Sequence, residues 1–202
     1  MKKDVLEKYF NVDNMALSWK YVNSEHISFS FGKDHAGIFQ YEIDLKNKLK
    51  KLSNSLLQGK YSPEDPMKFL VPKQGKISSR CVTILSIEDA LVYQAIANII
   101  AKENFETITS NDGQFNLGYT LNKNIIDIKT KNKNIENDRF YNPWQEGQKE
   151  REKRYDSIEK DKNIEYGLIT DINQFFDHIS HKKLIETLKK YFPKIEDDIL
   201  NF

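Results

Sequence analysis

The clearest pattern of hydrophobic and polar positions covers residues 42–57, where four leucines recur at intervals of three or four. This spacing predicts an amphipathic helix, and Gly59 follows it as a stop signal. Residues 1–22 carry a similar apolar stripe and are also predicted to be helical. Ser24–Phe39 breaks the pattern between these helices, and His35 is expected to be a solvated loop residue. The four leucines are Leu45, Leu49, Leu52 and Leu56.

Two β-type runs flank a Gln-Gly turn at residues 74–75, and this arrangement predicts a β-hairpin. From Met67 to Ile87 the chain has four basic residues and no acidic one, so the hairpin is expected to offer an anion-binding surface. The alternative is a solvated edge hairpin that its lysines protect from further pairing, and both stay open. Ser86 then begins a capping box that predicts a helix, in which Gln94 is a candidate for a buried hydrogen-bonding residue. The four basic residues are Lys68, Lys73, Lys76 and Arg80.

Residues 166–172 are apolar and β-branched, which predicts a strand, and Asp171 lies at its end. An aromatic turn follows over residues 174–176. Ser180 is then placed to cap a helix that Pro193 stops. A carboxylate fixed at a strand end beside aromatic rings can hold a metal ion next to a flat substrate. The local pattern alone is equally consistent with a second interpretation, in which Asp171 only caps a turn.

The composition is that of a folded chain without an overall charge bias. The 202 residues include 31 basic and 30 acidic side chains, for a net charge of +1, and 39% are hydrophobic. Such a hydrophobic content can build a core, whereas a nucleic-acid protein is often more basic overall. Cys81 is the single cysteine, so an internal disulfide is excluded, and it is expected to be a small core residue. The absence of a signal peptide or membrane-spanning run predicts a cytoplasmic chain without a membrane partner.

The segment from Asp171 to Leu184 reads D-I-N-Q-F-F-D-H-I-S-H-x-x-L and resembles the first catalytic motif of reverse transcriptases. The likeness is to the enzymes of group II introns, retrons and phage defence (abortive infection). Val-Pro-Lys ending at Lys73, followed by Arg80, is similar to the fingers hairpin of the same family. The resemblance implies an α+β fold: the fingers and partial palm of a right-hand polymerase, helix-rich, with a fingers β-hairpin and a palm strand. It implies a fingers subdomain at 1–120, a charged loop and helix insertion at 121–165, and the start of the palm at 166–202.

The resemblance also implies RNA-directed DNA synthesis by two-metal nucleotidyl transfer, with Mg²⁺ as the cofactor. Asp171 would bind both metal ions, and the backbone carbonyl of Ile172 would complete the shell of one. Phe176 matches the steric gate that leaves no room for a ribonucleotide 2′-hydroxyl. The implied partners are an RNA template, a DNA primer and a deoxynucleoside triphosphate. The other implied contacts to the triphosphate are Lys73, Arg80, Gln174 and Phe175.

The second catalytic motif of the family, Tyr-x-Asp-Asp, is absent from these 202 residues. Asp197 and Asp198 are a poor substitute, because no β-type run precedes them. We therefore expect an N-terminal part of a reverse transcriptase that acts in bacterial antiphage defence. The remaining palm and thumb are then one candidate partner chain, and whether this chain is itself an enzyme stays open. The alternatives are a non-catalytic nucleic-acid-binding or assembly module that retains a partial polymerase fold and, more weakly, an unrelated metal-dependent hydrolase that uses Asp171.

Overall fold

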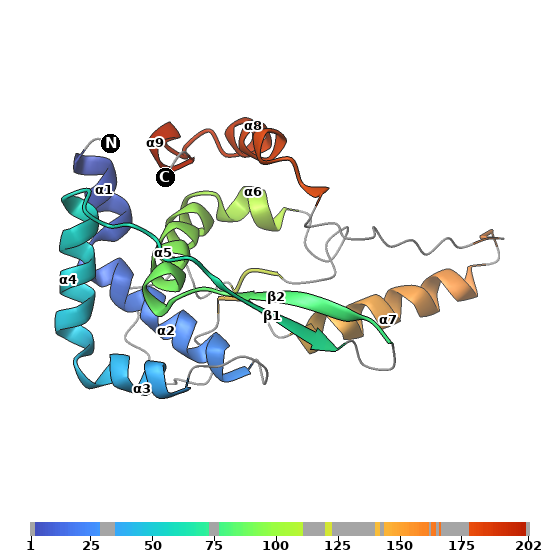
Figure 1. The fold of residues 1–202 in the computed structure, drawn as a ribbon. Helices are drawn as coiled ribbons and strands as arrows, with labels where there is room; N and C mark the ends of the chain where they lie inside the picture. Colours follow the sequence, from blue (N-terminus) through green and yellow to red (C-terminus); the bar gives the residue numbers. More distant parts are fainter. Residues whose placement is uncertain are drawn as a thin grey trace, which may run out of the picture. The chain divides into compact units, whose positions relative to one another are not determined.

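The computed structural model describes a helix-rich α+β chain with one small antiparallel sheet among its described residues (Figure 1). This agrees with the predicted fold class at the level of α+β. The described residues are 3–28, 35–72, 77–110, 120–122, 140–141, 144–161, 163–164, 166 and 178–200. Their elements are α1 (Lys3–Phe10), α2 (Val12–Ser28), α3 (His35–Ile43), α4 (Leu45–Leu57), β1 (Met67–Pro72), β2 (Ser79–Ile84), α5 (Ile87–Glu103), α6 (Phe105–Thr109), α7 (Trp144–Lys160), α8 (His181–Tyr191) and α9 (Asp197–Leu200).

The described residues fall into two compact units. One unit comprises the residues up to Ile99, and the other comprises those from Ile100 onward. The first unit therefore holds α1 to α4, the sheet and most of α5, and the second holds α6 to α9. The resemblance implies subdomain boundaries at residues 120 and 165, and these boundaries stay a prediction.

Helix α4 packs its leucine stripe into the core of the first unit, as the spacing predicts. Leu49, Leu52 and Leu56 are buried, and each contributes about 1.5–3 kcal/mol by leaving water. Beside them, the Ser53 hydroxyl donates a hydrogen bond of 2.6 Å to the carbonyl oxygen of Phe10, which ties α4 to the end of α1. The helix ends where Gly59 adopts a φ of 65°, so the predicted stop is confirmed.

A buried polar network joins α2 to α5. The side-chain amide of Asn14 donates to the carbonyl oxygen of Ala95 at 2.9 Å, and that of Asn98 donates to Oδ1 of Asn14 at 3.0 Å and to Oγ of Ser18 at 3.1 Å. Gln94 donates to Oδ1 of Asn98 at 2.8 Å, so the prediction that it is a buried hydrogen-bonding residue is confirmed. Because these groups satisfy one another inside the core, they fix one relative placement of the two helices.

Strands β1 and β2 form the predicted hairpin, which extends away from helices α1 to α4 (Figure 1). The register pairs Met67 with Ile84 and Val71 with Arg80. Because side chains alternate between faces, Leu70 and Cys81 lie on the opposite face from Val71. Cys81 is exposed on that face, so the prediction that it is a core residue is wrong.

Two further expectations from the sequence need correction. Helix α2 continues to Ser28, because nothing between Val12 and Ser28 is a glycine or proline that would end it. His35 is the first residue of α3 and does not belong to a loop. The break that the sequence predicts over Ser24–Phe39 is therefore shorter than expected.

The second unit contains two helices that the sequence predicts. The charged stretch at 145–162 forms α7, and Ser180 caps α8 by accepting a hydrogen bond from the backbone N–H of Lys183. Phe140 is buried, and its carbonyl oxygen accepts a hydrogen bond of 3.0 Å from the backbone N–H of Asn122. The next residue, Tyr141, pairs with Leu121 in an isolated antiparallel bridge. Among the helices described, none is long and apolar enough to cross a membrane.

Candidate functional site

Most residues of the predicted polymerase site lie outside the described part of the chain. Arg80 is the exception: its backbone belongs to β2 and pairs with Val71, although its side chain is not described. The roles of the whole set therefore stay predictions. The residues outside the described part are Lys73, Asp171, Ile172, Gln174, Phe175 and Phe176.

The base of the hairpin is fixed by a single buried carboxylate, that of Asp89 in the first turn of α5. The hydroxyl of Tyr61 donates to Oδ1 of Asp89. Oδ2 accepts from the hydroxyl of Ser86 at 2.7 Å and from the backbone N–H of Glu64 at 3.2 Å. The backbone N–H of Asp89 donates in turn to Oγ of Ser86 at 3.1 Å, so Ser86 caps α5 as the sequence predicts. Asp89 thus holds both the chain that enters β1 and the chain that leaves β2.

The surroundings of Asp89 shift the titration of two neighbours. Burial is the main cause that raises the pKa of the Tyr61 phenol, and the hydrogen bond to Asp89 raises it further. The pKa of Glu88 is raised above its ordinary value, chiefly because the protein removes water from its carboxyl group. The cation of Lys51 opposes this shift, and the negative charge of Glu64 adds to it.

An acidic cavity of about 270 Å³ opens beside this cluster. Three of its lining residues are the acids Glu64, Glu88 and Asp89, and Lys60 is the one cation among them. The carboxylate of Asp89 accepts hydrogen bonds from Tyr61, Glu64 and Ser86, so its main role is structural. The other lining residues are Ser55, Tyr61, Ser62 and Ser86.

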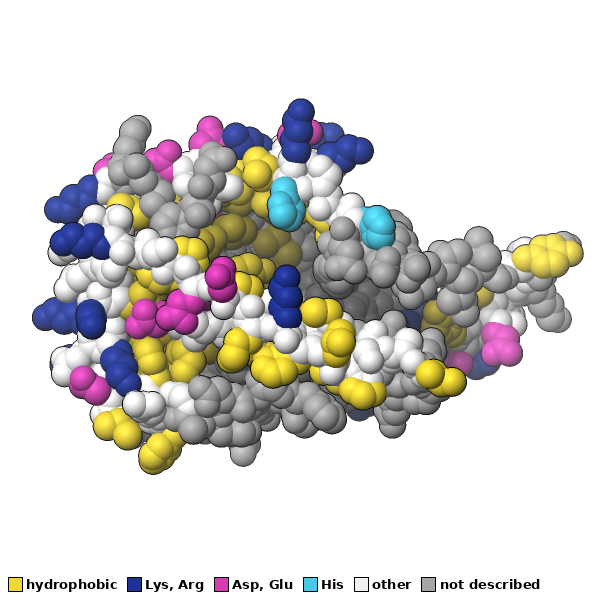
Figure 2. Space-filling view, viewed as in Figure 1, with side chains coloured by type: hydrophobic (Ala, Val, Ile, Leu, Met, Phe, Trp, Pro, Cys, Tyr) yellow, Lys and Arg dark blue, Asp and Glu magenta, His cyan; other side chains and the backbone are white. Residues whose placement is uncertain are grey.

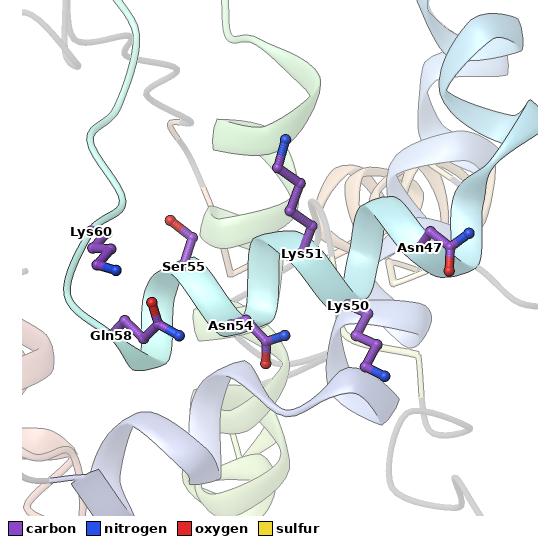
Figure 3. A pocket seen from close by; sticks show the side chains of 7 residues that line it. All are labelled: Asn47, Lys50, Lys51, Asn54, Ser55, Gln58 and Lys60. Atoms are coloured by element: carbon purple, nitrogen blue, oxygen red, sulfur yellow. The ribbon is translucent and has the colours of Figure 1, made fainter.

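A basic groove of about 390 Å³ runs along the outer face of α4 (Figure 3). It contains three lysines, three amides and a hydroxyl, and no acidic residue lines it. In Figure 3 the side chains of Lys50 and Lys51 project to opposite sides of the helix. Figure 2 shows Lys and Arg side chains along the edge of the molecule formed by α4. The lining residues are Asn47, Lys50, Lys51, Asn54, Ser55, Gln58 and Lys60.

This basic groove was not among the residues that we predicted to be functional. The sequence contained a signal for it, because six of its members are spaced as a single helical face and all are polar. Lysines on the outer face of a helix are usually solvated surface, so the sequence alone does not single them out. Lys60 lies beyond the end of α4, so only the structure shows that it lines the same groove.

The hairpin also carries a row of exposed hydrophobic side chains (Figure 2). Leu70 is 75% exposed, and Met67 and Phe69 are exposed as well. Lys68 lies between them in β1 and is exposed. A strand that mixes exposed apolar and basic residues matches either alternative for the hairpin, an anion-binding surface or a protected edge.

The described residues contain no group of three or more His, Cys, Asp or Glu side chains that could hold a metal ion. The predicted Mg²⁺ ligands, Asp171 and Ile172, lie outside those residues, so the magnesium site stays a prediction. Asp197 begins the short helix α9 and forms an ion pair of 2.7 Å with Lys189. Residues 178–196, directly before this pair, contain helix α8 and no strand, and the expectation that Asp197 and Asp198 do not substitute for the second catalytic motif stays a prediction.

Comparisons with protein-family models, with curated proteins and with solved structures give no match for this chain.

Proposed function

We propose that the chain is an N-terminal part of an RNA-directed DNA polymerase, with Asp171 as a metal ligand in nucleotidyl transfer. The motif from Asp171 to Leu184 carries the proposal, because its residue types recur at the positions that this chemistry uses. The β1–β2 hairpin supports it, since Arg80 pairs with Val71, which precedes Lys73 by two positions in the sequence. The Ser180 cap of α8 supports it as well, because a helix begins at the C-terminal end of the motif.

In this proposal the chain's own residues position the reactants. Lys73 and Arg80 bind the triphosphate from the hairpin, and the backbone amides of Gln174 and Phe175 lie along it. Phe176 packs under the sugar and excludes a 2′-hydroxyl. Bound Mg²⁺, held by Asp171 and the carbonyl of Ile172, supplies activation of the primer hydroxyl and stabilisation of charge on the triphosphate.

The proposed partners are an RNA template, a DNA primer and a deoxynucleoside triphosphate in the bacterial cytoplasm. The proposed role is antiphage defence, which rests on the likeness to defence-type reverse transcriptases. A second polypeptide that provides the rest of the palm and the thumb is a further proposed partner. The test is primer extension on an RNA template by the complete natural protein, with Asp171→Ala as the critical variant.

The second candidate function is a non-catalytic module that binds nucleic acid and retains a partial polymerase fold. The basic groove of α4 favours it, because such a surface attracts phosphates without any metal ion. This module would bind RNA or primer–template equally well in Mg²⁺ and in EDTA. Incorporation of nucleotides that stops on the Asp171→Ala change would exclude it.

A further inference from the structure

The basic groove of α4 is built as a continuous polar face. Asn47, Lys50, Asn54 and Gln58 follow one another at three- or four-residue intervals, and Lys51 and Ser55 lie alongside them. The opposite face of the same helix carries the buried leucine stripe. The helix is therefore held rigidly by the core, and its outer face is available to a partner.

The charge of the groove is of one sign. Lys50, Lys51 and Lys60 line it together with neutral groups that can donate hydrogen bonds. In the described part of the chain, none of these three ammonium groups forms an ion pair or a hydrogen bond, although the charge of Lys51 acts on Glu88 and lowers the pKa of that carboxyl group. The side chains of Asn54 and Gln58 are exposed there. Such a combination of cations and neutral donors suits phosphate oxygens.

The length of the groove argues for a chain of phosphates. With a rise of 1.5 Å per residue, the stretch from Asn47 to Gln58 is roughly 16 Å long. A single inorganic anion would need only a small part of that length. A nucleic-acid strand would place several phosphates along it, each within reach of one or two of the donors.

Two further features restrict the kind of contact. The lining residues include no aromatic side chain, so the groove offers no surface on which bases can stack. The acidic cavity shares Ser55 and Lys60 with the groove and brings in Glu64 and Glu88. Negative charge at this end repels a polyanion, which favours a path along α4 and away from the cavity.

We propose that the basic groove of α4 binds the phosphate backbone of a nucleic-acid strand, RNA or DNA, without reading its sequence. The groove is separate from the residues assigned to nucleotidyl transfer. It therefore adds a second nucleic-acid contact to a polymerase, or supplies the main one in a non-catalytic module.

The experiment is a titration of the full chain into fluorescent single-stranded oligonucleotides of mixed sequence, read as anisotropy at several salt concentrations. RNA and DNA of the same sequence form two arms. The test variant is Lys50→Gln with Lys51→Gln. The matched control is Lys182→Gln with Lys183→Gln, an adjacent pair of exposed lysines on α8 that removes the same charge. Circular dichroism of each variant checks that the helices remain folded.

We expect the test variant to bind about tenfold more weakly at low salt, with a log–log salt slope smaller by about one to two. The control variant should bind as the wild type does. Equal loss in both variants would contradict the proposal, because it would reflect net charge and not the groove. Absence of binding by the wild type would also overturn it.

The length dependence separates a polymer from a small anion. Binding in the groove should tighten as the oligonucleotide is lengthened from two to about ten nucleotides, in the RNA arm, the DNA arm or both. If inorganic triphosphate displaces the longest oligonucleotide at equal concentration, the groove is a small-anion site and the proposal fails. None of these outcomes depends on Asp171, so they leave the polymerase proposal to its own test.

Discussion

The hydroxyl of Tyr61 donates a hydrogen bond to Oδ1 of Asp89, across 28 positions of the chain. The residues between the two include the whole β1–β2 hairpin. Because the other carboxylate oxygen holds Ser86 and the backbone of Glu64, one side chain fastens both ends of the hairpin to α5. Within the described residues, the exposed strand β1 pairs with β2 in a sheet of two strands.

Replacing Asp89 by alanine should loosen the hairpin and lower the stability of the first unit. The change leaves the Tyr61 hydroxyl and the Glu64 N–H without their acceptor, at a cost of about 2–4 kcal/mol. Urea unfolding measures the loss. Amide hydrogen exchange should rise most strongly in β1 and β2. As a milder comparison, Tyr61→Phe removes only one bond and should cost about 1 kcal/mol; equal costs would contradict the central role of Asp89.

The side-chain amide of Asn98 should contribute more to the free energy of unfolding than that of Gln94, although both are buried in the same network. The Asn98 side chain forms hydrogen bonds with Asn14, Ser18 and Gln94, whereas the Gln94 amide donates to Asn98. We expect Asn98→Ala to cost about 2–4 kcal/mol and Gln94→Ala about 1–2 kcal/mol by denaturant unfolding. The reverse order would show that the network is not what joins α2 to α5.

Glu88 should make stability depend on pH. Its pKa is raised in the folded chain, so folding favours the protonated form. The contribution of Glu88 to the stability of the folded chain is present below its ordinary pKa of 4.5. This contribution is lost as the pH rises through the raised pKa. Glu88→Gln should therefore be more stable than the wild type at pH 7, with the difference shrinking toward pH 4. Thermal unfolding of both proteins across this range measures it, and a difference that grows in acid would contradict the assignment.

Phe176 should control the choice of sugar if the polymerase proposal is right. Phe176→Ala opens space beside the 2′ position, so incorporation of ribonucleotides should rise by about tenfold or more relative to deoxyribonucleotides. The measurement is the ratio of kcat/KM values for matched nucleotides. Tyr155→Ala, at an exposed aromatic residue of α7, is the control, and unchanged discrimination in Phe176→Ala would refute the gate.

The sequence predicts the elements whose signals are local. The leucines of α4, the glycine at its end, the Ser86 cap and the Ser180 cap each report on a few neighbouring residues, and the structure contains all of them. The hairpin follows from its two β-type runs.

What the sequence did not predict depends on contacts between distant segments. Asn14 and Asn98 are polar, and their burial is favourable because hydrogen bonds to each other and to distant parts of the chain satisfy them. Cys81 is exposed because its face of the hairpin is open among the described residues, which no local pattern could indicate. The basic groove gains Lys60 only because the chain turns at Gly59.

The most direct test of the central proposal is primer extension by the complete natural protein on an RNA template, with Mg²⁺ and deoxynucleoside triphosphates. The proposal predicts extension by the wild type, a loss of at least about a hundredfold in Asp171→Ala, and normal extension in the control Asp198→Ala. Undiminished incorporation by Asp171→Ala would contradict the assignment of Asp171. Absence of extension by the wild type, together with nucleic-acid binding that needs no Mg²⁺, would favour the non-catalytic module.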